Sequence, residues 1–148
     1  MASRRRAREY ALQALYQADL ARGSIPEALS GLWNGQIDSG DTDDLARRPA
    51  DSQEIEFATR LARGVEECLS ALDAGIEESS TNWRVARMSI VDRNILRLGA
   101  FELLHCDDIP ANVSINEAVE LAKRFGTKDS RGFVNGILDR IARDRGMF

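Results

Sequence analysis

The sequence predicts an all-α fold, and three observations support this prediction. Apolar residues recur at steps of three and four positions along most of the 148-residue chain, which is the spacing of a buried helix face. Aromatic residues are only 6% of the sequence, whereas alanine and leucine are plentiful, which favours helices over a β-sandwich. No segment alternates apolar and polar residues for long enough to predict a strand.

A first helix is predicted over residues 3–22. Ser3 can cap its beginning, and Gly23 is expected to end it. Its apolar face consists of small and branched aliphatic side chains at helical spacing: Ala7, Ala11, Ala14, Leu15 and Ala18. Ser24 can cap a short second helix that has Pro26 in its first turn, where proline is tolerated.

The stretch 35–51 differs from its surroundings in composition. It holds five aspartates and few large apolar residues, together with Gly40 and Pro49. Such a composition predicts a mobile acidic surface loop. Solvation is the simple explanation of its charge, and the alternative is that the loop masks a basic surface of the same chain.

A long helix is predicted to begin at Ser52, with apolar residues continuing at helical steps far along it. Gly64 and Gly75 lower the helix propensity, so a kink or a restart is expected near Asp73. Trp83 lies in a short segment after this helix, and we expect it to anchor that segment to the core.

Two capping boxes are the clearest local signals in the second half of the chain. The first, Ser89–Asp92, predicts a helix that runs to about Cys106. The second, Ser114–Glu117, predicts a helix that runs to Phe125. The acidic segment 107–110 ends in a proline and separates the two helices.

A last helix is expected after Gly126, with Thr127 or Asp129 as its cap. Its inner face is predicted to contain large apolar side chains: Phe133, Val134, Ile137, Leu138 and Ile141. Gly132 and Gly136 each cost roughly 1 kcal/mol relative to alanine inside a helix. We therefore expect another backbone or a ligand to approach them closely.

Length and composition indicate one globular domain over residues 1–148. No apolar run approaches the roughly 18 residues that a membrane span needs, and no apolar signal core follows the first residues. We therefore expect a cytoplasmic protein that does not enter a membrane. The formal net charge is -4, so any basic cluster is a local exception.

The sequence favours a binding protein over an enzyme. It has no Gly-rich phosphate loop and none of the common hydrolase or zinc-protease motifs. Its only histidine, His105, and its two cysteines, Cys68 and Cys106, stand apart, which leaves little for nucleophilic or metal catalysis. Both cysteines are expected to be small apolar core residues. We predict no catalytic residue, no metal and no cofactor.

Four arginines crowd the first eight residues: Arg4, Arg5, Arg6 and Arg8. A guanidinium is planar, permanently charged and carries five donors, which suits phosphates and base edges. Tyr16 lies two helical turns further on, so its ring either extends this strip as a stacking surface or belongs to the core. The pattern predicts single-stranded nucleic acid as a partner. The simple alternative is a solvated helix start or a disordered basic leader.

Six segments spread along the chain carry a resemblance to a known family: RRRARE (4–9), ALQALY (11–16), VDRNILR (91–97), FELL (101–104), INEAVELAK (115–123) and FVNGILD (133–139). Together they resemble the NusB family of bacterial transcription antitermination factors. The resemblance extends from Ser3 to about Arg143, and it is weakest across 35–51. The segments near the end of the chain are specific in combination, whereas the arginine run alone is not.

This resemblance implies a small all-α fold of about seven helices in two subdomains. It also implies binding of the boxA element of nascent RNA together with NusE, a small-subunit ribosomal protein. The pair would help to assemble a complex on RNA polymerase that suppresses termination, notably in rRNA transcription. Each protein is then expected to raise the affinity of the other for the same RNA.

The resemblance also implies roles for individual residues, by position. Four arginines and two aromatic residues fall on the side that would face RNA: Arg4, Arg5, Arg6, Arg8, Tyr16 and Phe133. Three charged residues fall on the side that would face NusE: Asp92, Arg93 and Asp129. Helix capping is a second explanation of the two aspartates, and a core position is a second explanation of Phe133.

Three alternatives stay open at this point. The N-terminal domain of some rRNA cytosine methyltransferases resembles the same fold, and we expect to exclude it because no cofactor-binding α/β segment follows residue 148. A second alternative is a protein-interaction module whose arginines bind an acidic partner. A third is a homodimer that buries the arginine helix. Sequence-selective RNA binding that NusE strengthens would separate the family function from the second alternative.

Overall fold

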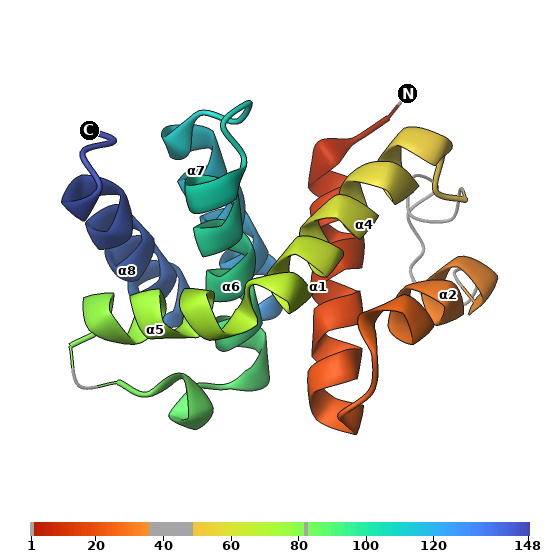
Figure 1. Cartoon of the computed structure of the whole chain (residues 1–148), viewed down its shortest axis with the longest axis horizontal. Coiled ribbons are helices and arrows are strands. Elements are labelled where there is room, and N and C mark those ends of the chain that lie inside the picture. The colour runs from red at the N-terminus through yellow and green to blue at the C-terminus, as the bar shows by residue number, and fades with distance from the viewer. Residues whose placement is uncertain (1, 36–48, 82) are drawn as a thin grey trace. The chain divides into compact units, whose positions relative to one another are not determined.

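The computed structural model describes residues 2–35, 49–81 and 83–148. Within these residues the chain forms seven α-helices and one short 3-10 turn, with no strand (Figure 1), which confirms the predicted fold class. By its internal contacts the chain divides into two compact units, Met1–Arg63 and Gly64–Phe148. Most of the predicted acidic loop lies outside the described residues. In the part of the chain that is described, no helix combines the length and apolar character that crossing a bilayer requires.

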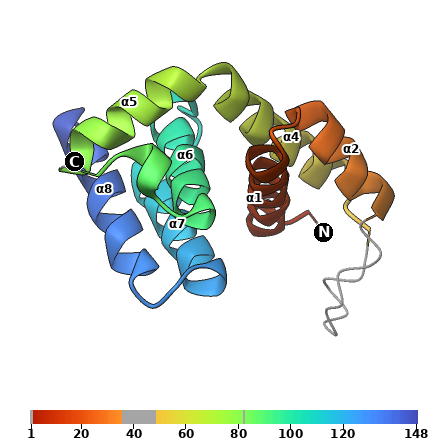
Figure 2. The same cartoon turned by 90° about the horizontal axis from the view of Figure 1, so that it is seen from below.

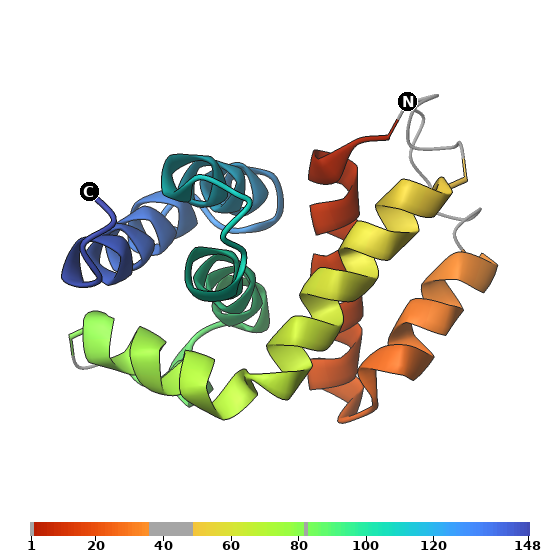
Figure 3. The same ribbon diagram turned by 45° about the horizontal axis from the view of Figure 1, so that its top comes forward.

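The first unit contains α1 (Arg4–Ala21), α2 (Ile25–Gly35) and most of α4 (Ser52–Glu67). α2 packs against α1, and α4 crosses over α1 (Figures 1 and 3). The buried face of α1 is rich in alanine, which allows neighbouring helices to approach closely: Ala7, Ala11, Ala14 and Ala18, with Leu12 and Leu15. Tyr10 of α1 packs edge-on against Trp33 of α2, with ring centroids 5.3 Å apart.

The predicted serine caps of α1 and α2 are confirmed. Each hydroxyl oxygen accepts a hydrogen bond from the backbone N–H three residues later, at 3.1 Å for Ser3 and 3.2 Å for Ser24. At the end of α1, Arg22 and not Gly23 adopts the left-handed conformation that closes the helix (φ 54°). The prediction that Gly23 ends this helix is therefore wrong by one residue.

α4 begins with a capping box that the sequence analysis missed. The backbone N–H of Glu54 donates to Asp51 Oδ1 (2.9 Å), and the backbone N–H of Asp51 donates to Glu54 Oε1 (3.1 Å). Ser52 is the first helical residue, as predicted, but Asp51 is the residue that caps the helix. Assigning Asp51 to the acidic loop hid this signal, because D-x-x-E before an apolar run marks a helix start.

The long predicted helix is two helices, and the break lies at Cys68 and not near Asp73. α4 ends one residue before Cys68, and α5 covers Leu69–Ser79. The backbone of Cys68 has φ -107° and ψ 14°, outside the regular helical range. Asp73 lies within α5, so the predicted position of the restart was wrong.

The two glycines that suggested a kink have different surroundings. A Cβ atom at Gly64 would lie 2.1 Å from Phe101 Cζ, so the absence of a side chain there makes room for the Phe101 ring. A Cβ atom at Gly75 would meet nothing within 4 Å. Gly64 therefore serves the packing of α4 on α6, and it does not break the helix.

The second unit contains α5, a 3-10 turn (Val85–Arg87), α6 (Ile90–His105), α7 (Ala111–Phe125) and α8 (Ser130–Asp144). α6, α7 and α8 pack against one another, and α5 runs across α6 and α8 (Figures 1 and 2). Short connections make α6, α7 and α8 alternate in direction, so α6 and α8 begin at the same end of this unit. α6 is its central helix, because ten consecutive residues from Asn94 to Leu103 are buried.

The second predicted capping box is not a helix start. α7 begins at Ala111, one turn earlier than predicted, directly after Pro110. Ser114 is buried, and its hydroxyl donates to Glu102 Oε1 on α6 (3.0 Å). The S-x-x-E pattern in this helix therefore contains a buried hydrogen bond between two helices, which satisfies two polar groups inside the core.

A bidentate ion pair ties α5 to α6. Arg97 Nε and Nη2 donate to the two carboxylate oxygens of Asp73 at 2.8 and 2.9 Å. Arg97 Nη1 donates to Asn94 Oδ1 (3.1 Å), and the Asn94 amide donates to the carbonyl of Ile90 (2.8 Å). The charge of a buried arginine is thereby matched, and the first turn of α6 is held to α5.

The inner face of α8 is confirmed at four of its five predicted positions: Val134, Ile137, Leu138 and Ile141 are buried, and Phe133 is half-buried. The expectation for Gly132 and Gly136 is wrong. Both glycines are exposed, and a Cβ atom at either position would meet nothing within 4 Å. No close approach of another backbone explains them within the described residues.

We expect Gly64→Ala to lower the free energy of unfolding by about 1–3 kcal/mol, because the added methyl group must displace the Phe101 ring. Gly75→Ala is the matched control, since it also lies inside a helix but opens into free space. It should raise the stability by about 0.5–1 kcal/mol through helix propensity alone. Urea denaturation followed by circular dichroism measures both. Equal effects would show that packing on Phe101 does not require the glycine.

Candidate nucleic-acid interface

A buried carboxylate joins the beginnings of α1 and α4. Glu54 is only 1% exposed. Its Oε2 accepts from the backbone N–H of Ser3 (2.9 Å), and its Oε1 accepts from that of Asp51 (3.1 Å) and from Arg6 Nη1 (3.4 Å). A buried carboxylate requires such partners, because desolvating an unpaired charge is very costly. Glu54 therefore fixes the first turn of α1, where the arginines lie, against α4.

The four arginines of α1 do not share one environment. Arg4 and Arg5 are exposed in the first turn. Arg6 is only partly exposed, because its guanidinium pairs with the buried carboxylate and lies 5.2 Å from the centroid of the Tyr10 ring. Arg8 is 4% exposed. The structure thus presents two of the predicted RNA-side arginines to solvent and packs the other two within the fold.

Three guanidinium groups surround the ring of Phe57 in α4. Their Cζ atoms lie 4.3 Å (Arg4), 5.3 Å (Arg8) and 5.9 Å (Arg60) from the ring centroid. Such cation–π contacts restrict long side chains that would otherwise be mobile. Sequence reasoning missed Phe57 and Arg60. Their i, i+3 spacing, which places both on one face of α4, is the signal that would have paired them.

Tyr16 lies on the exposed side of α1, with 37% of its surface accessible. Leu20, one turn further along the same helix, is 61% exposed. The core position that the sequence left open for Tyr16 is therefore not the one observed. Its ring is accessible to a planar group from solvent, as a stacking surface requires.

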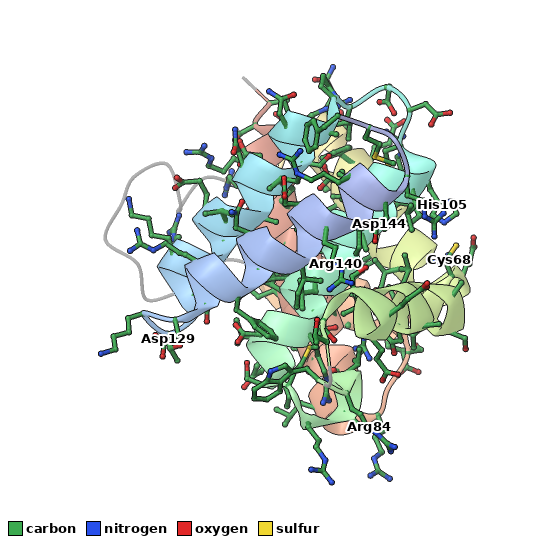
Figure 4. All side chains as sticks on the ribbon, turned by 90° about the vertical axis from the view of Figure 1, so that its left-hand side faces the viewer. Cys68, Arg84, His105, Asp129, Arg140 and Asp144 are labelled. Carbon is green, nitrogen blue, oxygen red and sulfur yellow. The ribbon has the colours of Figure 1, made fainter. Side chains whose placement is uncertain are left out.

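An aromatic pair lies on the second unit. Phe133 packs edge-on against Trp83, with ring centroids 5.9 Å apart. Trp83 is 53% exposed, so the expectation that it anchors its segment to the core is wrong; Val85 is the buried residue there. Arg84 is exposed next to it (Figure 4). The sequence analysis named Phe133 but not its ring partner.

The three residues predicted to face NusE lie close to the beginnings of two helices. Asp92 and Arg93 are in the first turn of α6, and Asp129 immediately precedes α8 (Figure 4). Because α6 and α8 run in the same direction, these helix starts share one end of the second unit. The predicted partner residues are therefore grouped on this end, although they are distant in sequence.

Helix capping does not account for the two aspartate side chains. Ser89 Oγ accepts from the backbone N–H of Asp92 (3.0 Å), so the serine half of that capping box is confirmed. The carboxylate half is not, because Asp92 Oδ1 is buried and has no hydrogen-bond partner. Asp129 occupies the N-cap position of α8, but its side chain makes no capping hydrogen bond. Neither carboxylate satisfies the N–H groups of its own helix.

The cysteines and the histidine lie apart from these groups of residues. Cys106 is buried, as predicted, whereas Cys68 is partly exposed at the break between α4 and α5. His105 is exposed at the end of α6, and its ring stacks on Phe101 with centroids 5.4 Å apart. Figure 4 labels both Cys68 and His105.

An all-α chain with an arginine-rich helix start and exposed aromatic rings is typical of small helical proteins that bind nucleic acid. Comparison with known families makes the class specific. The NusB family profile matches residues 5–143, so this chain belongs to the NusB family.

Relatives match over nearly the whole chain. A transcription antitermination protein NusB of Myxococcus xanthus is 49% identical over 142 residues, which cover 96% of this chain and 96% of that protein. A solved structure of T. maritima NusB has a TM-score of 0.82 and 40% identity, and the match covers 97% of this chain and 94% of that chain. A crystal structure of antitermination factors NusB and NusE in complex with double-stranded RNA has a TM-score of 0.78, covering 95% and 96%. At 24% identity this last likeness shows the fold alone.

We expect Glu54→Gln to lower the free energy of unfolding by about 1–3 kcal/mol, because an amide NH2 group would face N–H donors where an oxygen now accepts. Glu56→Gln is the matched control, since Glu56 is exposed on the same helix. Its effect should stay within about 0.5 kcal/mol. Urea denaturation of both variants measures the difference. Equal stability would mean that the buried carboxylate does not hold α1 to α4.

Proposed function

We propose that this protein is a transcription antitermination factor that binds boxA-type single-stranded RNA together with NusE. The resulting complex would assemble on RNA polymerase and support processive rRNA transcription. One observation carries the proposal: in a member of the NusB family, Arg4 and Arg5 are exposed on a helix start that a buried carboxylate holds in place. NusE and RNA are the components of the related complex described above, and we carry both over as part of the proposal.

The proposed function is binding, and the arginines contribute to it in two ways. Arg4 and Arg5 neutralise RNA phosphates directly, since both are exposed. Arg6 and Arg8 act as positioning residues, because one pairs with Glu54 and the other is buried beside the Phe57 ring. This division refines the expectation that all four arginines contact RNA.

The exposed rings supply the second ingredient of single-strand binding, a surface on which bases stack. Tyr16 extends the arginine strip along α1, in line with its exposure. On the second unit, Phe133 and Trp83 together offer a wider aromatic surface than either ring alone. We assign the same role to both places, and we assign it to Trp83 only as the partner of Phe133.

The partner side of the proposal is centred on Asp92, Arg93 and Asp129. A donor from NusE would satisfy Asp92 Oδ1, which is buried without a hydrogen bond in the free chain. Relief of an unsatisfied buried acceptor is worth about 1–3 kcal/mol, which makes this position a strong contributor to an interface. Because binding free energies are reciprocal, NusE would tighten RNA binding as much as RNA tightens NusE binding.

Fluorescence anisotropy with a boxA RNA and a base-scrambled control, each with and without NusE, tests the proposal. Selective binding that NusE strengthens is the expected result. Equal weak binding to both RNAs, unchanged by NusE, would contradict it and favour a protein-interaction module. Size-exclusion chromatography of the free protein at the same concentrations would reveal a homodimer that hides the arginine helix.

We expect the double change of Arg4 and Arg5 to alanine to flatten the log–log salt dependence of RNA binding by about 1.4, at roughly 0.7 per phosphate. Thermal stability should not change, because both side chains are exposed. Arg8→Ala should instead lower the free energy of unfolding, since Arg8 is buried. Arg22→Ala, exposed at the far end of α1, is the control. A flatter slope for Arg8→Ala at unchanged stability would show that Arg8 contacts RNA directly.

We expect Asp129→Asn and Asp92→Asn each to weaken NusE binding by roughly five- to tenfold, or about 1–1.4 kcal/mol, because a charged acceptor at the interface is lost. Binding of RNA in the absence of NusE should stay unchanged. Asp107→Asn is the matched control, because Asp107 is exposed just beyond the opposite end of α6. Isothermal titration with NusE measures the three affinities. An equal loss in the control would place the NusE interface elsewhere.

A further inference from the structure

A cavity of about 550 Å³ lies where α1 and α4 begin, within the first unit. Sites for small molecules in proteins measure roughly 300–1,000 Å³, so one nucleotide has room there. The walls combine charged, amide and aromatic side chains from both helices: Ser3, Arg4, Gln53, Glu56, Phe57 and Arg60. Sequence analysis assigned a role to only one of these side chains, Arg4, as an RNA contact.

The positive charge in the cavity is held in a fixed geometry. The guanidinium groups of Arg4 and Arg60 lie 4.3 and 5.9 Å from the centroid of the Phe57 ring. Phe57 is 6% exposed, so the guanidinium groups and the helices around it cover the ring. The cavity therefore presents planar cationic groups supported from behind by an aromatic ring, a surface on which a base can stack.

The buried carboxylate in the wall does not cancel this charge. Both oxygens of Glu54 accept hydrogen bonds from the protein, including one from Arg6. Gln53 adds an amide, which donates and accepts at once and so matches the mixed edge of a base. The chemistry of the cavity is thus cationic at two points, planar at one and amphoteric in hydrogen bonding at another.

We propose that this cavity holds one unstacked nucleotide of the bound RNA, an assignment that rests on the RNA binding proposed above. The phosphate lies against Arg4 and Arg60. The base enters the cavity, stacks on the guanidinium of Arg4 and meets the amide of Gln53 with its edge. Single-stranded RNA supplies splayed-out bases of this kind, and arginine planes are among the surfaces that receive them. An acidic peptide would use the two cations but not the stacked surface or the volume.

An abasic scan of the boxA RNA tests this assignment. Each nucleotide in turn is replaced by an abasic one, and the affinity is measured for the unchanged protein and for Gln53→Ala. We expect one position at which the abasic change costs about tenfold in the unchanged protein, and at which Gln53→Ala then adds no further loss. Arg60→Gln should flatten the salt slope by about 0.7, as expected for one phosphate. Arg63→Gln, the same charge change three residues further along α4 and outside the cavity lining, should not.

The outcomes separate this proposal from the function on which it rests. Selective RNA binding with no position coupled to Gln53, or with equal effects of Arg60→Gln and Arg63→Gln, would overturn the nucleotide site and leave the antitermination function standing. Weaker NusE binding by Arg60→Gln at unchanged RNA affinity would overturn it too, because the cavity would then serve the protein partner. Absence of selective RNA binding by the unchanged protein would contradict both. Circular dichroism of each variant confirms that it is folded.

Discussion

The buried carboxylate of Glu54 is the interaction on which the binding end of the molecule depends. Four arginines at the beginning of a helix oppose its dipole and repel one another, so the first turn of α1 would be expected to fray. Glu54 counters both effects, because it places a negative charge against Arg6 and accepts the backbone N–H of Ser3. The exposed Arg4 and Arg5 are thereby displayed on an ordered turn, and fewer rotamers need to be frozen when a ligand binds.

Helix starts that are determined locally could be predicted from the sequence. The caps at Ser3, Ser24 and Ser89 depend only on residues within one turn, and all three are observed. Where a distant residue competes for the same group, the local pattern misled. The hydroxyl of Ser114 has a buried carboxylate on α6 within reach, so it does not cap α7. The break at Cys68 likewise has no Gly or Pro signal, because packing and not propensity decides where α4 ends.

The candidate site could be predicted in residue type but not in environment. The sequence and the family resemblance named Arg8 as an RNA-side residue, yet its burial depends on Phe57, which lies far along the chain in another helix. Trp83 was assigned to the core for the same reason, since its contact with Phe133 joins two segments of the second unit. Charge and spacing indicate which chemistry is present; only the packing of helices decides which side chains reach the solvent.

The exposed glycines of α8 have a consequence for the order in which this molecule loosens. Each makes the helix less stable by about 1 kcal/mol than alanine would, and neither gains a packing contact in return. The first half of α8, which follows Asp129, is therefore a part of the second unit that opens locally at low free energy, whereas the central α6 is buried on all sides. Backbone amides at 132–136 should exchange with solvent before those of α6. A partner that docks on this helix start would stiffen it, and the entropy lost would weaken the association while leaving its selectivity intact.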